Sequence, residues 1–402
     1  MNPESSKLYC AWAHAGLALH NSGRALLCCH SRTYLEDDSQ QKIYWHTHRL
    51  DDAWHSPTRR EIQQALDAGE RHPNCAACWD EEAAGRESRR TCTNNIFSID
   101  GDPETPRLMD LKLGNTCNLA CRMCWPEVSS KWYREYFEVY EKHHRSDADY
   151  TIFLQRWSSI QHSYNRDNHV FWDDIRELIA GVMYFDIFGA EPMLLDRLFE
   201  VLAYAVSNGH SSSQRIHINT NATIWNQDYI DILCKFQEVI MDLSIDAVGI
   251  QAEYIRYGEP WTKVLDNLGK YQQLKKHHRN IQVNICITVN PLNVFYLPEI
   301  WKFFSDEFPD FVKFFNLVHM PEHMCIRSLP DKIKTVIYHR LTDEDVNNTS
   351  FLKLVRGVAD FMMIPMADQS KHWQEFLRST QALDQIRSQN FQTTFPELHQ
   401  LI

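Results

Sequence analysis

The sequence has no long uninterrupted hydrophobic run, and this absence restricts where the protein can work. Its longest apolar stretches are much shorter than the roughly 20 residues that a membrane-spanning helix needs. The N-terminus also lacks a charged region followed by an apolar one, which is the pattern of a secretory signal. We therefore expect a cytoplasmic protein that does not have a membrane as a partner.

An excess of positive charge is also missing. The 402 residues include 41 Lys and Arg against 53 Asp and Glu, which gives a formal net charge of -12. Phosphate backbones are bound by clustered basic side chains, so this balance argues against nucleic acid as a partner. The basic run at 275–279 is short and ends a predicted helix, where the helix dipole accounts for it.

Cysteine, by contrast, is plentiful and clustered. The twelve cysteines lie in a chain too large to need disulfide staples, which favours metal binding in a reducing compartment. Cys117, Cys121 and Cys124 lie in LKLGNTCNLACRMCWP with the spacing C-x3-C-x2-C. Three thiolates on one short loop can hold an iron-sulfur cluster and leave its fourth iron open for a second ligand. Zinc would need a fourth ligand, and neither a His nor a Cys follows closely.

From residue 108 onward, short β-type runs alternate with amphipathic helical stretches. Strands are predicted at Leu108–Leu113, Val182–Phe188, Arg215–Asn219, Val239–Ser244, Val283–Val289 and Val312–Val318, and helices at Met193–Asn208, Trp225–Phe236, Trp261–Lys276 and Leu297–Phe308. Six such β/α units predict an α/β fold with a parallel sheet or an open, incomplete barrel. In such folds the chemistry lies at the C-terminal ends of the strands.

Changes in composition and in secondary-structure pattern along the sequence predict three domains. Residues 1–107 form a small separate domain, in which a turn at 21–23 between apolar runs predicts a β-hairpin and residues 57–69 predict a helix. Residues 108–330 form the barrel, with a polar, aromatic insertion at about 143–168. Residues 331–402 form a helical C-terminal extension.

The three-cysteine loop resembles the defining motif of radical S-adenosylmethionine (SAM) enzymes, C-x3-C-x-φ-C, with Met123 at the φ position. This resemblance implies a partial (β/α)6 radical SAM barrel, a catalytic [4Fe-4S] cluster and SAM as cofactor. In that family, one electron from the cluster cleaves SAM to methionine and a 5'-deoxyadenosyl radical, while the protein positions the cofactor and excludes competing reactions. The backbone of Met123 would approach the adenine.

Other strand ends resemble the SAM-binding positions of the family. The run 189–192, G-A-E-P, resembles the G-G-E-P motif that receives the SAM amino group, with alanine replacing the second glycine. Short polar side chains after the next two strands would bind ribose or the SAM carboxylate, and an E-Y-I-R-x-G run offers an arginine for that carboxylate. The candidate SAM-binding residues are Met123, Gly189, Ala190, Glu191, Asn219, Asn221, Ser244, Asp246 and Arg256.

These motifs also have ordinary structural interpretations. A Gly-Ala-Glu-Pro run is a common start of a helix, and Asn or Ser commonly ends a strand in a turn. Arg256 is as well explained by an ion pair with Glu253 on one helical turn.

A second cysteine group lies in the N-terminal part. Cys10, Gly23 and Cys28 follow the C-x9-15-G-x4-C hairpin of SPASM and twitch domains, and Cys75 and Cys78 add a C-x2-C pair. The resemblance implies a twitch-like domain with a second, auxiliary [4Fe-4S] cluster, although four-cysteine zinc has the same ligand count. Cys29 could replace Cys28, but side chains alternate along a strand, so only one of the two should face the metal.

The resemblance to twitch domain-containing radical SAM proteins covers nearly the whole chain. It implies an enzyme that abstracts hydrogen from a peptide, a protein or a small metabolite, with an external electron donor such as flavodoxin or ferredoxin. Two alternatives stay open: an RNA-modifying radical SAM enzyme, which the acidic balance disfavours, and a non-catalytic, metal-stabilised binding protein, which the open fourth position of the cysteine loop disfavours. Spacing identifies no general acid, base or hydrogen donor.

Overall fold

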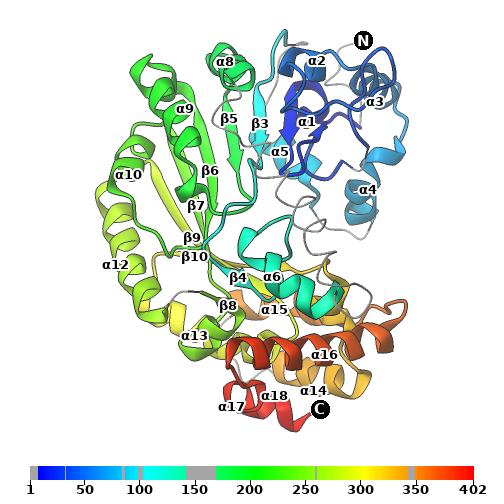
Figure 1. Ribbon diagram of the computed structural model, residues 1–402, viewed down its shortest axis with the longest axis vertical. Coiled ribbons are helices and arrows are strands. Elements are labelled where there is room, and N and C mark those ends of the chain that lie inside the picture. The colour runs from blue at the N-terminus through cyan, green and yellow to red at the C-terminus, as the bar shows by residue number, and fades with distance from the viewer. Residues whose placement is uncertain are drawn as a thin grey trace. The chain divides into compact units, whose positions relative to one another are not determined.

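The computed structural model describes residues 8–31, 33–83, 87–97, 103–141, 169–258, 260–342 and 349–402 (Figure 1). The predicted insertion at 143–168 lies outside these residues. Within the described part of the chain, no helix is both long enough and apolar enough to cross a membrane.

Ten strands are described. They are β1 Gly16–Leu19, β2 Ala25–Leu26, β3 Leu108–Leu111, β4 Ala120–Cys121, β5 Tyr184–Ile187, β6 Arg215–Thr220, β7 Glu238–Ser244, β8 Arg256–Tyr257, β9 Ile281–Val289 and β10 Val312–Leu317. Eight of them form a sheet in the order β10-β9-β7-β6-β5-β3-β1-β2, and β4 pairs with β8. From β3 to β10 the strands of this sheet follow one another in chain order, as in a singly wound β/α barrel. The prediction of an α/β fold with a parallel sheet is confirmed.

Helices alternate with the strands in the barrel, whereas four described helices follow one another between β2 and β3. The described helices up to residue 307 are α1 Ala11–Ala15, α2 Leu50–Trp54, α3 Pro57–Asp67, α4 Ala76–Ala83, α5 Arg89–Ile96, α6 Tyr133–Tyr136, α8 His169–Leu178, α9 Asp196–Ser207, α10 Gln227–Leu233, α11 Ile250–Ile255, α12 Trp261–His277 and α13 Leu297–Glu307. Pro57 and Pro298 lie in the first turns of α3 and α13, where the missing N–H costs no helical hydrogen bond. Among the described residues after 330, five further helices are present: α14 Asp331–Thr342, α15 Thr349–Met363, α16 Gln369–Arg387, α17 Phe391–Thr394 and α18 Pro396–Gln400.

The chain divides into two compact units, which are described separately. The first comprises residues 1–116, 158–218 and 226–239, and the second comprises 117–157, 219–225 and 240–402. The predicted boundaries at residues 107 and 330 are not tested by this division and stay predictions.

In the first unit, the N-terminal segment extends the sheet of the β/α repeat. β1 pairs in parallel with β3, and β2 returns antiparallel to β1 through a turn in which Gly23 has a φ of +86°. Glycine suits this left-handed position because it has no Cβ to clash. Sequence patterning predicted the hairpin, but not that β1 would lie beside β3, because that pairing joins residues about 90 positions apart.

In the second unit, β9 and β10 pair in parallel, and the C-terminal helices gather beyond them (Figure 1). The β9 segment IQVNICITV is almost entirely buried, and Ile281, Val283, Ile285 and Ile287 alternate with other side chains along it, as expected for the two faces of a strand. Helix α15 packs against α14 and β10. Helix α16 packs against short turns that follow β10 and against the segment Phe137–Glu141.

Candidate metal centres and cofactor site

The three-cysteine loop belongs to the second unit and is held by backbone and side-chain hydrogen bonds. Cys121 lies on β4 and pairs in register with Arg256 on β8. The indole N–H of Trp132 donates to the Cys121 carbonyl at 2.8 Å, and the Cys124 N–H donates to the same carbonyl at 2.9 Å. The Ser129 hydroxyl donates to the Leu119 carbonyl at 2.6 Å. These hydrogen bonds therefore hold the loop in place without a metal.

The three thiol groups lie close together, and N–H donors approach two of their sulfurs. The hydrogen bond between Cys121 and Cys124 lowers the pKa of Cys121 and raises that of Cys124, and Cys117 is close enough to raise the pKa of Cys124 further. The backbone N–H of Leu119 donates to Cys117 Sγ at 3.4 Å, and Arg256 Nη1 lies 3.8 Å from Cys121 Sγ. Three converging thiolates with donors at their sulfurs fit a [4Fe-4S] cluster, whose sulfur ligands are stabilised by such hydrogen bonds.

Arg256 is committed to a buried ion pair. Its Nε lies 2.7 Å from Asp246 Oδ2, and Asp246 is completely buried. Burial lowers the pKa of Arg256, but the charge of Asp246 outweighs this and the net pKa is raised. Asp246 also accepts the Thr288 N–H at 2.8 Å, while Glu253 accepts the Trp261 N–H. Two of the predicted SAM residues thus bind one another, and the structure does not contain the Arg256–Glu253 pair considered from sequence.

Asn221 braces the cysteine loop. Its amide donates to Asn118 Oδ1 at 2.9 Å and lies 3.9 Å from Cys117 Sγ, and its own Oδ1 accepts the Thr223 N–H at 3.0 Å. Asn221, Ser244 and Arg256 together line a small cavity of about 20 Å³. The structure therefore brings these three predicted residues together, and their role in SAM binding stays a prediction. Binding a molecule as large as SAM there requires side chains to move, because pockets for such ligands are typically about 300 Å³ or more.

The Gly189–Glu191 segment belongs to the first unit. Gly189 has a φ of +84° and Ala190 a φ of +54°, so the alanine occupies a left-handed conformation that costs about 1 kcal/mol compared with glycine. The Glu191 N–H donates to the Thr116 carbonyl at 3.0 Å, and its buried carboxylate caps the following turn by accepting the Met193 N–H at 3.1 Å. The ordinary helix-start role is thus present, and the SAM role of this segment stays a prediction. So do those of Met123, which is buried in the loop, and Asn219 on β6.

The four N-terminal cysteines come together in the first unit. Cys10 precedes α1, Cys28 follows β2, Cys75 ends the short turn Pro73–Cys75, and Cys78 lies on α4. The thiol of Cys10 interacts with those of Cys75 and Cys78, and the thiol of Cys28 interacts with those of Cys10, Cys75 and Cys78. Burial, followed by these neighbours, raises the pKa of Cys10, Cys28 and Cys75 to about 12. The structure thus brings together the four thiols of the predicted auxiliary site.

Cys29 faces another group. Burial and the neighbouring Asp110 raise its pKa, and its thiol hydrogen-bonds with Asp110 rather than lying among the four cysteines. Cys28 is therefore the member of the adjacent pair that joins the quartet. Cys92 lies exposed on α5, with its Sγ 3.9 Å from Glu87 Oε2.

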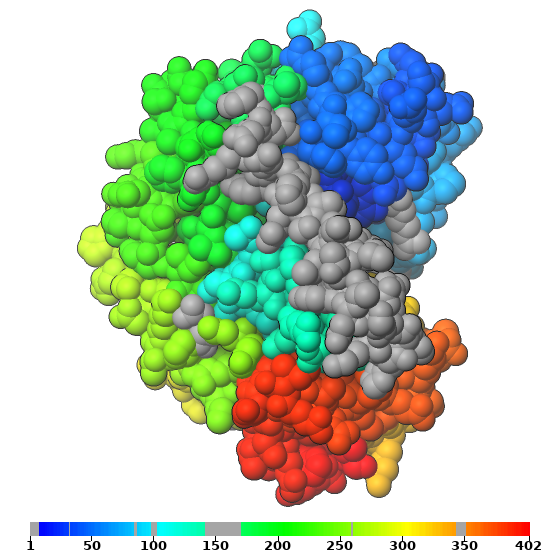
Figure 2. Space-filling model, viewed as in Figure 1, coloured from blue at the N-terminus to red at the C-terminus, as the bar shows by residue number. Residues whose placement is uncertain are grey.

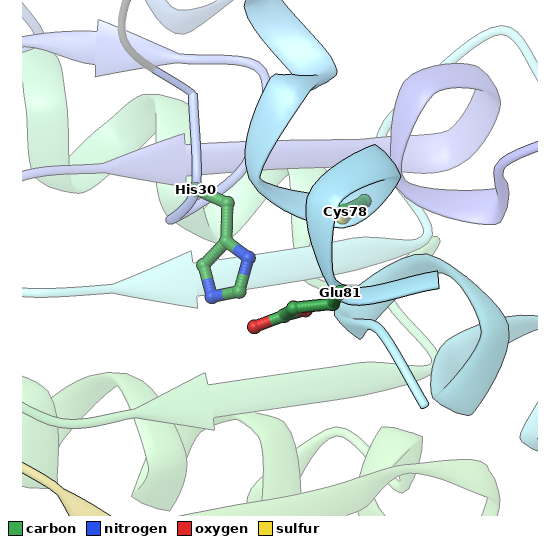
Figure 3. Close-up of side chains that lie close together, drawn as sticks. All are labelled: His30, Cys78 and Glu81. Atoms are coloured by element: carbon green, nitrogen blue, oxygen red, sulfur yellow. The ribbon is translucent and has the colours of Figure 1, made fainter. Parts of the chain in front are cut away.

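His30 and Glu81 lie beside this quartet, and sequence reasoning missed both. Their ligand atoms and Cys78 Sγ are within 4.8 Å of one another, and Figure 3 shows the His30 ring and the Glu81 carboxylate turned toward the same space beside α4. Glu81 is three residues after Cys78, so helical spacing puts both on one face of α4. That spacing was a usable signal for Glu81, whereas the position of His30 depends on the fold.

A buried charged row was also missed. Asp110 on β3, Asp186 on β5 and His217 on β6 are register partners, and Arg89 from α5 reaches them. Arg89 Nη2 lies 2.6 Å from Asp186 Oδ2 and 3.6 Å from Asp110 Oδ2, and His217 Nδ1 lies 2.8 Å from Asp186 Oδ1. Burial raises the pKa of Asp110 to about 6, helped by the charge of Asp186. Burial also opposes ionisation of Asp186, but Arg89 and His217 outweigh it and lower that pKa to about 2. An isolated Asp inside each apolar strand was the available signal.

Residues 111–294 match the model of a protein family described as the radical SAM superfamily. This stretch of the chain is therefore similar to radical SAM domains. Solved structures similar to it include anSMEcpe with bound AdoMet, with 15% identity, coverage of 58% of this chain and 57% of that one, and a TM-score of 0.37. A complex of anSMEcpe with AdoMet and the Kp18Cys peptide has 13% identity, coverage of 60% and 61%, and a TM-score of 0.40. SuiB from Streptococcus suis bound to S-adenosylmethionine has 13% identity, coverage of 71% and 56%, and a TM-score of 0.35.

The match of this chain to the anSMEcpe structures spans 55–61% of their length. No curated protein matches it. The matched stretch contains Cys117, Cys121 and Cys124 together with every predicted SAM-binding residue. The four N-terminal cysteines lie before the matched stretch, so their twitch-like character rests on the resemblance of their motif.

Proposed function

We propose that this protein is a radical SAM enzyme that reductively cleaves SAM at a [4Fe-4S] cluster on Cys117, Cys121 and Cys124 and removes hydrogen from a bound substrate. The observation that carries the proposal is the convergence of these three thiols on a braced loop within the matched radical SAM domain. The loop itself supplies three ligands, which leaves one iron for the amino and carboxylate groups of SAM.

The bound cluster and SAM would supply a carbon-centred radical, and the chain supplies the setting for it. Arg256 places positive charge beside Cys121 Sγ, which stabilises the negative charge of a thiolate-bound cluster. Asp246 holds the guanidinium at that position. Asn221 and Asn118 fix the loop on the side of Cys117. These residues orient the ligands rather than take part in bond breaking.

We further propose that Cys10, Cys28, Cys75 and Cys78 hold an auxiliary [4Fe-4S] cluster in a twitch-like domain. Support comes from the thiol–thiol interactions that link Cys28 to the other three cysteines and from the hairpin spacing. Tetrahedral zinc would hold its sulfurs about 4 Å apart, because each Zn–S bond is about 2.3 Å. The same four thiols could also hold zinc, so the metal content of the purified protein decides between the two groups.

The proposed substrate is a peptide, a protein or a small metabolite, and the proposed electron source is an external one-electron donor such as flavodoxin or ferredoxin. Both follow from the resemblance to twitch and SPASM enzymes. We place the protein in the cytoplasm, where such donors and reduced thiols occur.

The test is iron content and SAM cleavage after anaerobic reconstitution of three proteins. The wild type should hold about eight irons per chain and form 5'-deoxyadenosine when it is reduced. The Cys117/Cys121/Cys124→Ala variant should hold about four irons and form none, whereas a Cys10/Cys28→Ser variant should lose the other four and keep some SAM cleavage.

Cys234→Ala is the matched control, because this half-buried thiol lies outside both cysteine groups and should leave both readouts unchanged. A wild type that binds zinc, or that cleaves no SAM when it is reduced, would instead favour a metal-stabilised binding protein.

A further inference from the structure

A cavity of about 340 Å³ adjoins the cysteine loop within the second unit. Three segments form it: the loop and the turns after it, the segment that follows the C-terminal end of β10, and helix α16. Figure 2 shows the teal surface of residues 117–141 beside the red surface of α16. The lining residues are Cys124, Trp125, Tyr136, Tyr140, Met320, Pro321, Glu322, His323, His372 and Glu375.

The position of this cavity suits a substrate. It lies after the C-terminal end of a barrel strand, where active sites of β/α barrels are built, and it includes one of the proposed cluster cysteines. Its volume is within the range of small-ligand pockets, about 300–1,000 Å³, and matches a single side chain or a small metabolite. The C-terminal extension contributes His372 and Glu375, which are three residues apart and so share one face of α16.

Aromatic rings make up one wall. Tyr136 and Tyr140 lie 4.7 Å apart between ring centroids, and Trp125 follows directly after Cys124. The hydroxyl of Tyr140 lies 3.2 Å from His323 Nε2. Burial lowers the pKa of His323 to about 4, so this ring is neutral near pH 7 and brings no positive charge into the cavity.

The charged groups of the cavity favour a cation. Glu375 is already occupied, because both of its oxygens accept hydrogen bonds from Arg378 at 2.9 and 2.6 Å. The same guanidinium lies 5.5 Å from the ring centroid of Tyr140, so this wall already holds one cation between a carboxylate and an aromatic ring. Glu322 is the second carboxylate. It lies 3.5 Å from His372 Nε2 and is 52% exposed, which leaves it accessible to a ligand.

We infer that this cavity is the substrate pocket and that the substrate carries a cationic amino or guanidino group on an aliphatic chain. Glu322 receives the cation, and the rings of Trp125 and Tyr136 cover the chain. The assignment as a substrate pocket rests on the proposed radical SAM function, whereas the preference for a cation rests on the cavity alone. The cationic group belongs either to a free small molecule or to a basic residue of a peptide.

Isothermal titration of the reconstituted, unreduced protein tests this preference without turnover. The small probes are butylguanidinium and its neutral isostere butylurea, and the peptide probes are acetyl-glycyl-arginyl-glycinamide and its citrulline counterpart. We expect the cationic member of at least one pair to bind about tenfold more tightly than its neutral partner, which corresponds to about 1.4 kcal/mol. The tighter pair then identifies the source of the cation.

Glu322→Gln should reduce that preference to about twofold or less, since it removes the charge and keeps the shape. Glu307→Gln on α13 changes an exposed carboxylate outside the cavity and should keep the tenfold preference. Equal affinity within both pairs, absence of binding by all four probes, or a preference that survives Glu322→Gln would each overturn the inference.

Iron content and SAM cleavage of the same preparations separate this inference from the proposed function. Cation binding without SAM cleavage would leave the cavity as a cation site and remove the enzymatic proposal. SAM cleavage without cation binding would support the enzymatic proposal and overturn the inference of a cation site.

Discussion

The two cysteine groups of this protein are assembled in different ways. Cys117, Cys121 and Cys124 lie on one loop, and their spacing alone brings their thiols close together. Cys10, Cys28, Cys75 and Cys78 come from separate segments, which meet because α1, the β1–β2 hairpin and α4 share one hydrophobic core. The spacing of a local motif is thus enough to predict that its three thiols lie close together. The quartet, by contrast, forms only when the whole first unit folds.

The supports of the two groups differ as well. Two ion pairs hold the three-cysteine loop: Arg256–Asp246 beside Cys121, and Arg122–Asp384, in which the buried Arg122 belongs to the loop itself. The quartet lies next to Arg89, whose charge acts on Cys28 and which is shared between the carboxylates of Asp110 and Asp186. Substitutions around the loop should therefore mainly affect SAM cleavage, and substitutions around the quartet should mainly affect the stability of the folded protein.

The largest difference should come from single ligand changes. Cys121→Ala removes a thiol of the loop and should reduce 5'-deoxyadenosine formation by at least about 100-fold, because a cluster with two protein ligands does not assemble. Cys10→Ser should keep SAM cleavage within about tenfold of wild type, since the quartet does not bind SAM in our proposal. Anaerobic assays with dithionite, normalised to iron content, measure both. Equal losses in the two variants would contradict the separation of roles.

The next effect concerns stability. Arg89→Met leaves Asp110 and Asp186 buried without their shared cation, and breaking a buried ion pair costs about 3–5 kcal/mol. We expect guanidinium unfolding monitored by circular dichroism to show a loss of that size. Arg60→Met is the control, because its ion pair with Asp38 is exposed and surface pairs are worth about 0–1 kcal/mol. A loss below about 1 kcal/mol for Arg89→Met would show that the carboxylates are neutralised by another route.

A smaller, pH-dependent effect should distinguish Asp110 from Asp186. The pKa of Asp110 in the folded state is about 6, above its ordinary value of 3.8, so the folded state binds this proton more tightly and loses stability as pH rises from about 4 to 6. Asp110→Asn should remove that loss and stabilise the protein by about 2–3 kcal/mol at pH 8. The gain should be smaller at pH 4.5, where the folded wild type keeps the proton.

Asp186 should behave in the opposite way. Its pKa is lowered to about 2, so its contribution is present above about pH 4 and is lost as pH falls toward 2. Urea unfolding of wild type and Asp110→Asn at pH 4.5 and 8 checks the sign, with the exposed Asp310→Asn as a control that should show no difference. An equal gain at both pH values would show that Asp110 does not titrate in this range.

The fold was predictable to the extent that its elements have local periodicity. Each predicted strand from Leu108 onward overlaps a strand of the structure, because short apolar runs between amphipathic helical stretches favour strands. The parallel pairing of β1 with β3 was not predictable, since a four-residue apolar segment carries no information about a distant partner.

The sites show the same limit. Asn221, Ser244 and Arg256 were chosen as SAM-binding candidates because each follows or adjoins a strand end in a recognisable motif; the structure places them at one cavity, and their SAM role stays a prediction. The commitment of Arg256 to Asp246 was not visible, because ion-pair partners on different strands are chosen by side-chain geometry. The aromatic and acidic cavity beside Cys124 was likewise hidden, since it joins the loop to a helix about 250 residues later.

The smallest expected effect concerns whether zinc and an iron-sulfur cluster use different ligands at the quartet. Zinc accepts nitrogen, sulfur and oxygen ligands, and His30, Cys78 and Glu81 offer one of each within 4.8 Å. His30→Ala should therefore weaken zinc binding to the iron-free Cys117/Cys121/Cys124→Ala protein by about tenfold, and should leave the iron content of the reconstituted protein unchanged. Competition with a chromophoric chelator measures the first, and iron analysis measures the second. If His30→Ala lowers iron instead, His30 supports the cluster, and the quartet is not a complete ligand set by itself.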